Sequence, residues 1–151
     1  MALFQNFPLI AAICAIIFAQ FVKIPIAFFT TRKWDWSLFN STGGMPSSHS
    51  AAVTALTTGV ALEEGMGSTL FAVSAVLAII VMYDSSGVRR QTGEQAIAIN
   101  QLMKDFQRMV LEPKQHKPLK ELKEVLGHKP IEVFFGGLTG TMLTLFLHIF
   151  V

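Results

Sequence analysis

Long apolar runs constrain this chain more than any other feature of its sequence. Four of them are long enough, or nearly so, to cross a bilayer as helices: residues 7–29, 50–62, 68–83 and 130–151. A helix needs about 20 apolar residues to span the hydrocarbon core. The second and third runs are shorter, which favours local thinning of the bilayer or burial against neighbouring helices.

The composition supports a membrane protein rather than a soluble one. The 151 residues are 52% hydrophobic and only 15% charged, with a mean hydropathy of +0.50. A typical soluble domain contains more charge than this. We therefore expect an all-α fold, a polytopic transmembrane bundle of about four spans with amphipathic cytoplasmic helices, forming one integral membrane domain over residues 1–151. The single Cys14 lies in an apolar run, where packing is its expected role.

The 12 Lys and Arg residues are distributed unevenly among the loops. Arg32 and Lys33 follow the first run, and nine cations occupy the segment between the third and fourth runs. The turn between the second and third runs carries Glu63 and Glu64 instead. With four spans, the basic loops fall on one membrane face, which the positive-inside rule makes cytoplasmic. We expect a multi-pass protein of the cell membrane with both termini on the other side.

The basic segment before the fourth run contains two amphipathic stretches. Between residues 93 and 110, apolar side chains recur at helical spacing, and Lys104 and Arg108 belong to the opposite face. A shorter amphipathic piece covers residues 119–126, after Pro118. Two interpretations stay open: these helices cap the bundle or lie on the lipid headgroups, or they present a face to a protein partner.

Residues 43–50 open the second run with glycines, hydroxyl side chains and His49. Ser47 and Ser48 are suitable caps for the following helix, so a capping turn with an incidental histidine is one interpretation. The other is chemical, because free amides at a helix start bind anions and hydroxyls add donors. An imidazole, whose pKa lies near neutrality, can then give a proton to a leaving oxygen. His49 is thus a candidate general acid, with Ser47 and Ser48 as candidate phosphate ligands.

A second histidine, His128, opens the fourth run, and Glu132 follows it by four residues. On a helix these two side chains share a face. A carboxylate in that position fixes the imidazole tautomer and leaves the other ring nitrogen as a nucleophile or base. The alternative is an ordinary polar neighbour, although an unpaired carboxylate in an apolar run is costly.

Cations surround these two segments in the expected topology. Arg89 and Arg90 suit bidentate phosphate contact, or they anchor the chain at the cytoplasmic face. Lys23 interrupts the first run, where it either snorkels to the headgroups or points into a polar site. Arg32 ends the same run.

We predict a convergence of these groups at one membrane face. Its members are His49, His128, Glu132, Lys23 and at least one of Arg32, Arg89 and Arg90. The sequence contains no His-x-x-x-His or Glu-x-x-His pair, and the His128 motif has no second carboxylate, so we expect neither a metal nor a cofactor.

Three glycines form a small face early in the fourth run. Gly136 and Gly140 have the four-residue spacing at which helix backbones approach closely in membranes, and Gly137 lies between them. We predict that this face meets the first or second run.

The histidine segments resemble a known superfamily. Pro46-Ser47-Ser48-His49 resembles the Pro-Ser-Gly-His signature of the type-2 phosphatidic acid phosphatase and vanadium haloperoxidase superfamily. His128 with Glu132 resembles the closing His-x-x-x-Asp of its third motif. Together with the segment at residues 84–90, they are similar to the small divergent branch of that superfamily. The resemblance implies that His49 is the general acid, that His128 is the nucleophile that forms phosphohistidine, and that Glu132 orients it.

The chain departs from the superfamily pattern at two places. Eight residues separate Lys23 from Arg32 where the first motif has six, and Leu122 occupies the place of the third-motif arginine. Arg89 or Arg90 is the candidate replacement for that arginine.

The function implied by the resemblance is a metal-independent phosphatase that acts on a phospholipid or isoprenoid phosphate or diphosphate in the membrane. The alternative is a non-catalytic relative that binds anionic headgroups or a membrane partner. No nucleic-acid partner is expected, and the oligomeric state stays open.

Overall fold

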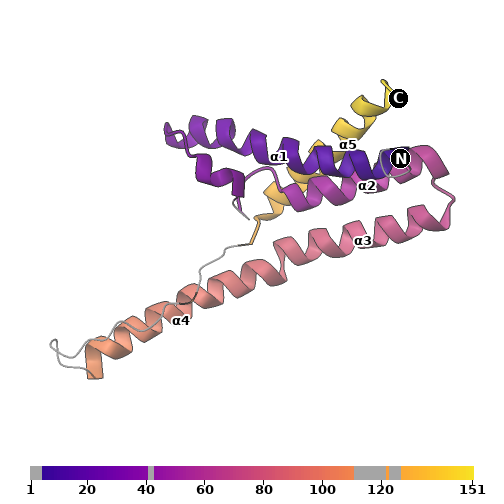
Figure 1. Ribbon diagram of the computed structural model, residues 1–151. Helices are drawn as coiled ribbons and strands as arrows, with labels where there is room; N and C mark the ends of the chain where they lie inside the picture. Colours follow the sequence, from indigo (N-terminus) through magenta and orange to yellow (C-terminus); the bar gives the residue numbers. More distant parts are fainter. Residues whose placement is uncertain (1–4, 41–42, 111–121, 123–126) are drawn as a thin grey trace.

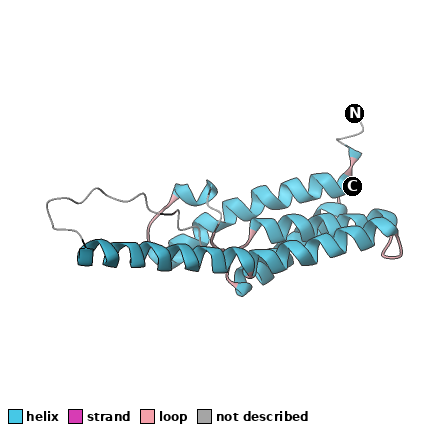
Figure 2. Ribbon diagram, turned by 90° about the horizontal axis from the view of Figure 1, so that it is seen from below, coloured by secondary structure: helices cyan, strands magenta, loops and turns pink. Residues whose placement is uncertain are grey.

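The structure is a computed structural model that describes residues 5–40, 43–110, 122 and 127–151. The described part is helical and contains no strand (Figure 2). Its elements, in chain order, are α1 (Phe7–Thr31), the short 3-10 helix η2 (Trp36–Asn40), α2 (Ser48–Glu64), α3 (Thr69–Ser86), α4 (Val88–Val110) and α5 (Pro130–His148). The predicted all-α class is confirmed.

Three helical stretches are long and apolar enough to cross a membrane: Phe7–Phe29, Thr69–Met109 and Pro130–His148. The remaining predicted run, helix α2, has 17 residues. It is the inner helix of the bundle, because it packs against α1, α3 and α5. The prediction of a polytopic bundle with about four spans is therefore confirmed, and burial accounts for the shortness of its second member.

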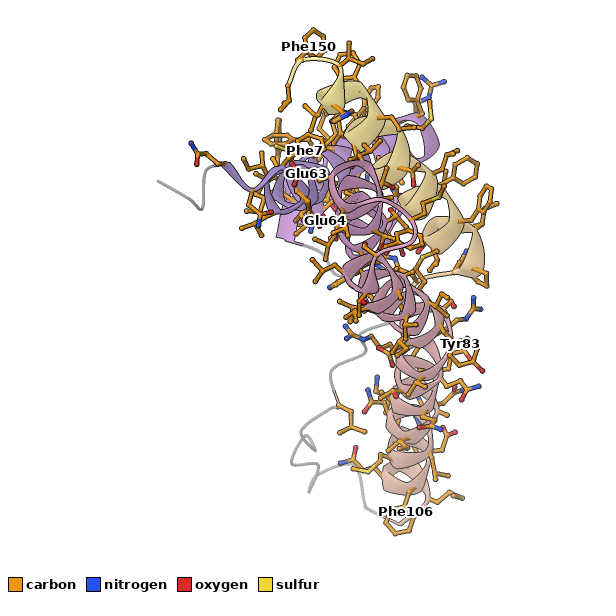
Figure 3. The ribbon with its side chains drawn as sticks, turned by 90° about the vertical axis from the view of Figure 1, so that its right-hand side faces the viewer. Phe7, Glu63, Glu64, Tyr83, Phe106 and Phe150 are labelled. Atoms are coloured by element: carbon orange, nitrogen blue, oxygen red, sulfur yellow. The ribbon has the colours of Figure 1, made fainter. Side chains whose placement is uncertain are left out.

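The helices alternate in direction, so the bundle has two distinct ends (Figure 1). One end gathers both termini and the turn between α2 and α3, where Glu63 and Glu64 lie near Phe7 (Figure 3). The other end gathers the starts of α2 and α5 and the end of α3, and α1 runs past them before it ends (Figure 1). Helix α4 continues from α3 beyond this second end and carries Phe106 far from the bundle (Figure 3).

Side chains before the helices satisfy amides that the first turn leaves free. The side chain of Asn6 accepts a hydrogen bond from the Leu9 N–H at the start of α1. Ser68 does the same for the Phe71 N–H at the start of α3. Helix α5 begins instead with Pro130, a residue that suits the first helical position because its missing N–H would be unpaired there.

Small residues allow the backbones of α1 and α2 to approach closely. Ala15 and Ala19 of α1 form a fully buried cluster with Ala51 and Ala55 of α2. In a membrane, where lipid is as apolar as leucine, such close packing is a main source of helix association. The large apolar side chains point outward instead, as lipid contact requires; exposed examples are Ile13, Phe21, Val73, Ile79, Phe134 and Met142.

The contact between α2 and α5 is closer still. A Cβ atom on Gly136 would overlap the Ser47 carbonyl oxygen, and one on Gly140 would overlap the Ala51 carbonyl oxygen. The Thr54 hydroxyl donates a hydrogen bond of 3.0 Å across this contact to the Gly137 carbonyl. The predicted small-residue face therefore meets the second run, which confirms that prediction.

Helix α4 covers the first predicted amphipathic stretch and begins five residues earlier, after a break at Gly87. Its buried Asn100 exchanges two hydrogen bonds with the backbone of Leu122, at 2.9 and 2.8 Å. Apart from Leu122, the second amphipathic stretch lies outside the described residues.

The close α2–α5 contact predicts that Gly140→Ala destabilises the protein by about 1–3 kcal/mol, the usual cost of overpacking. Gly67→Ala is the matched control, because a Cβ there meets nothing within 4 Å. Thermal unfolding of both variants in detergent measures the difference. Equal melting temperatures for the two variants would contradict the packing described.

Candidate functional site

Backbone hydrogen bonds tie three helix ends together at the second end of the bundle. The Ser47 N–H, just before α2, donates to the Glu132 carbonyl in the first turn of α5 at 3.0 Å. The His128 N–H, just before α5, donates to the Ser85 carbonyl at the end of α3 at 3.1 Å. Residues that are distant in sequence therefore meet at fixed positions.

The two histidines face each other at this junction. Their ring centroids are 6.2 Å apart, with the ring planes inclined by 63°. His128 is only 2% exposed, whereas His49, in the first turn of α2, is exposed. The junction thus places one exposed and one buried imidazole side by side.

Glu132 orients the ring of His128. Its Oε2 atom lies 3.0 Å from Nδ1 of His128 and accepts a second hydrogen bond, of 3.1 Å, from the Lys129 N–H. A carboxylate accepts hydrogen bonds, so the ring proton belongs on Nδ1 and the lone pair on Nε2. This Nε2 atom is buried and has no hydrogen-bond partner among the described residues. The arrangement leaves one buried ring nitrogen with a lone pair that no described residue uses.

Lys23 points into the bundle rather than toward the headgroups. It is 2% exposed and lies within electrostatic range of Glu132 and His49. A Cβ atom on Gly44 would lie 3.9 Å from its Cδ, which places the glycine loop directly against the lysine stem. Of the two interpretations of Lys23, the inward one is confirmed.

The arginines after α3 lie beside the histidines but are paired with acids. Arg89 pairs with Asp84, and Arg90 pairs with Glu94 at 2.9 Å. Arg89 lies within electrostatic range of His49, as does Lys23. Arg89 is therefore the arginine whose charge the structure places near His49.

The structure does not bring Arg32 to the histidine pair. Its backbone ends α1 in the left-handed conformation, with φ of 58°, and its side chain is exposed. It lies nine residues beyond Lys23, about 13 Å along the helix axis at 1.5 Å per residue. The first-motif pair is therefore split between the site and the end of α1.

The two predicted serines are buried at the start of α2. Ser47 is the helix cap, and its hydroxyl oxygen accepts hydrogen bonds from the Ser50 N–H at 3.3 Å and the Ser50 hydroxyl at 3.1 Å. It is fully buried, and Ser48 is 5% exposed. Ser47 therefore caps α2, as its position before the second run predicted. Phosphate contact by Ser47 or Ser48 stays a prediction.

Sequence reasoning missed residues that hold the site through the backbone. Ser85 receives the His128 N–H, and Gly127 packs so closely that an added Cβ would overlap the backbone of Arg90. Asn100 holds the returning chain at Leu122. A glycine directly before a candidate nucleophile was the only available signal, since backbone partners leave no pattern in a sequence.

The described site is rich in cations and contains one carboxylate close to the histidines. Among the described residues there is no group of three or more His, Cys, Asp or Glu side chains that could hold a metal ion. Such a site can stabilise the negative charge of a phosphate, donate a proton from one imidazole and offer a lone pair from the other.

The comparisons with known proteins agree with the motifs. A model of the family described as the divergent PAP2 family matches residues 4–143. The chain is also 62% identical, over 156 residues, to "Uncharacterized membrane protein YuiD" of Bacillus subtilis (strain 168), with 99% of each chain covered. No solved structure matches it. Since the family model covers nearly the whole chain, the resemblance seen in the motifs is confirmed: this multi-pass membrane protein belongs to the divergent PAP2 family.

Proposed function

We propose that this protein is a membrane-embedded phosphatase that hydrolyses a lipid or isoprenoid phosphate or diphosphate through a phosphohistidine on His128. The observation that carries the proposal is the state of this ring. Glu132 engages Nδ1, while Nε2 is buried and has no partner among the described residues, and the ring centroid lies 6.2 Å from that of His49. A structural histidine in a bundle normally has both nitrogens satisfied.

In the first step, Nε2 of His128 attacks the phosphorus and forms the N–P bond while the bond to the leaving oxygen breaks. His49 gives its proton to that oxygen, so the lipid leaves as a neutral alcohol, or as a phosphate when the substrate is a diphosphate. Glu132 stabilises the cationic ring of His128 as the bond forms. Lys23 and Arg89 offset the charge on the phosphoryl oxygens.

In the second step, water attacks the phosphohistidine. His49, now neutral, accepts a proton from this water, the N–P bond breaks, and the lone pair returns to Nε2. Inorganic phosphate leaves and His49 is again protonated. His49 thus acts as the general acid in the first step and as the general base in the second, and both roles belong to a side chain of this protein.

The alternative is a relative that binds anionic headgroups without hydrolysing them. Two observations favour it: Arg89 and Arg90 already pair with Asp84 and Glu94, and the third-motif arginine is replaced by the exposed Leu122. Phosphate binding by either arginine then requires it to leave its acid, or to use guanidinium nitrogens that the acid does not engage.

The first prediction concerns the two histidines in a metal-free assay with a panel of lipid phosphates. We expect His128→Ala to abolish turnover. His49→Ala should slow release of an alkyl alcohol by about 10²- to 10⁴-fold, the usual contribution of a general acid. It should slow release of a nitrophenol much less, because that group leaves without protonation. Vanadate, which mimics five-coordinate phosphorus, should inhibit competitively.

His148→Ala is the matched control, since this histidine lies at the opposite end of α5. Full activity of His128→Ala, or complete inhibition by a chelator, would contradict the mechanism. Headgroup binding by folded protein that hydrolyses none of the panel would favour the alternative.

The second prediction concerns Glu132. We expect Glu132→Gln to lower kcat with little change in KM, because its role is to stabilise the ring cation that forms during reaction. Glu64→Gln, at the other end of the bundle, is the control. A rise in KM at unchanged kcat would instead make Glu132 a binding residue.

The third prediction concerns orientation. We propose that the histidine end of the bundle faces the cytoplasm, because the described cations Arg32, Arg89 and Arg108 lie at or beyond the ends of α1 and α3. In a Cys14→Ala background, Glu64→Cys should react with an impermeant maleimide in intact cells, whereas Arg108→Cys should react only in inverted vesicles. Both positions are exposed in the structure. The reverse pattern would overturn the assignment.

A further inference from the structure

The chain reverses its direction directly after α1. Helix α1 ends at Thr31, and Arg32 adopts the left-handed conformation while its N–H caps the Phe28 carbonyl at 2.8 Å. This is a common way to end a helix, although here it occurs at a residue other than glycine. The Asp35 carboxylate then accepts a hydrogen bond of 3.0 Å from the Ser37 N–H, at the start of η2.

Ring contacts show where the chain goes after the reversal. Trp34 stacks on Phe28, with centroids 4.5 Å apart, and Phe39 meets Phe21 edge to face at 5.1 Å. Phe28 and Phe21 are seven residues apart on α1, about 10 Å along its axis at 1.5 Å per residue. Residues 32–40, named here the rim segment, therefore run back along α1 toward its middle, and η2 lies beside α1 before α2 begins (Figure 1).

Along the axis of α1, the histidine site lies at about the same position as the last residues of the rim segment. Lys23 falls between Phe21 and Phe28 and is about 12 Å before the end of α1, at 1.5 Å per residue. His49 is within electrostatic range of this lysine. Helix α2 thus starts part of the way along α1, which explains why its 17 residues suffice for an inner helix.

The chemistry of the rim segment changes along its descent. At its top, Arg32 and Lys33 are exposed, as are Trp34 and Trp36, at 60% and 69%. Tryptophans with cations are typical of the membrane–water interface on an anionic leaflet. Farther along, the chain forms the 3-10 helix η2, which pairs part of its backbone internally and so suits a segment beside lipid.

We propose that the rim segment is re-entrant and binds anionic phospholipid of the leaflet at the histidine end. Arg32 and Lys33 contact the headgroups, Trp34 and Trp36 lie at the interface, and Phe39 contacts the acyl chains. The histidine pair consequently lies below the headgroup level, so its ligands come from molecules that already reside in the bilayer. This inference concerns membrane contact and does not depend on catalysis.

Trp34 and Trp36 are the two tryptophans of the chain, so intrinsic fluorescence reports directly on the rim segment. In vesicles that contain lipids brominated near the headgroup or near the bilayer centre, Trp36→Phe leaves Trp34 as the reporter at the top. A variant with Trp34→Phe, Trp36→Phe and Phe39→Trp reports on the bottom. We expect bromines near the headgroup to quench Trp34 more than bromines near the bilayer centre do. The ratio of deep to shallow quenching should be higher for the tryptophan at position 39.

One result would contradict the proposal directly. If shallow bromines quench the tryptophan at position 39 at least as strongly as they quench Trp34, the rim segment does not enter the bilayer. Equal quenching of both by aqueous acrylamide, with none by brominated lipid, would place it in water. If Phe39→Trp fails to fold, Leu38→Trp in the same background replaces it.

A second arm tests the lipid class in mixed vesicles of anionic and zwitterionic phospholipid. We expect stronger quenching of the native tryptophans when the bromines are on the anionic lipid than when they are on the zwitterionic lipid at the same fraction. This preference should be lost in Arg32→Gln/Lys33→Gln and kept in Lys104→Gln/Arg108→Gln on α4. No preference in the native protein, or its loss in both variants alike, would overturn the headgroup contact.

Discussion

The hydrogen bond between the Ser47 N–H and the Glu132 carbonyl sets the geometry of the histidine end. It joins the start of α2 to the first turn of α5, and the glycine contacts beside it bring the two helix backbones close together. His49 lies two residues after one end of this bond, and His128 four residues before the other. Their 6.2 Å separation is therefore a property of the helix contact, and it does not require the two rings to attract each other.

The same contact explains how polar groups persist inside an apolar bundle. Lys23, Glu132 and His128 are each costly to bury alone, but together they form an arrangement of opposite charges and hydrogen bonds. Nε2 of His128 is left out of this arrangement among the described residues. In the mechanism proposed for this member of the divergent PAP2 family, Nε2 of His128 is the atom to which the phosphoryl group becomes attached.

Local chemistry made part of this structure predictable. Ser47 is a cap, Gly136 and Gly140 have close-packing spacing, and His128 and Glu132 are one helical turn apart; each statement needs only neighbouring residues. Arg32 could not be placed in this way, because the reversal at its left-handed backbone separates it from Lys23 without any glycine to signal it. The contact of Asn100 with Leu122 joins residues 22 apart and uses backbone atoms, which every residue type supplies equally.

The most direct test is to identify the nitrogen that carries phosphorus during turnover. The phosphoenzyme can be trapped in detergent by quenching at alkaline pH, because phosphohistidine is labile in acid. NMR of protein with ¹⁵N-labelled histidine then distinguishes the two ring nitrogens. We predict a single N–P bond at Nε2 of His128, because Glu132 holds Nδ1. Phosphorus on Nδ1 of His128 or on His49, or rapid hydrolysis with no phosphohistidine, would contradict the proposed role of the Glu132–His128 pair.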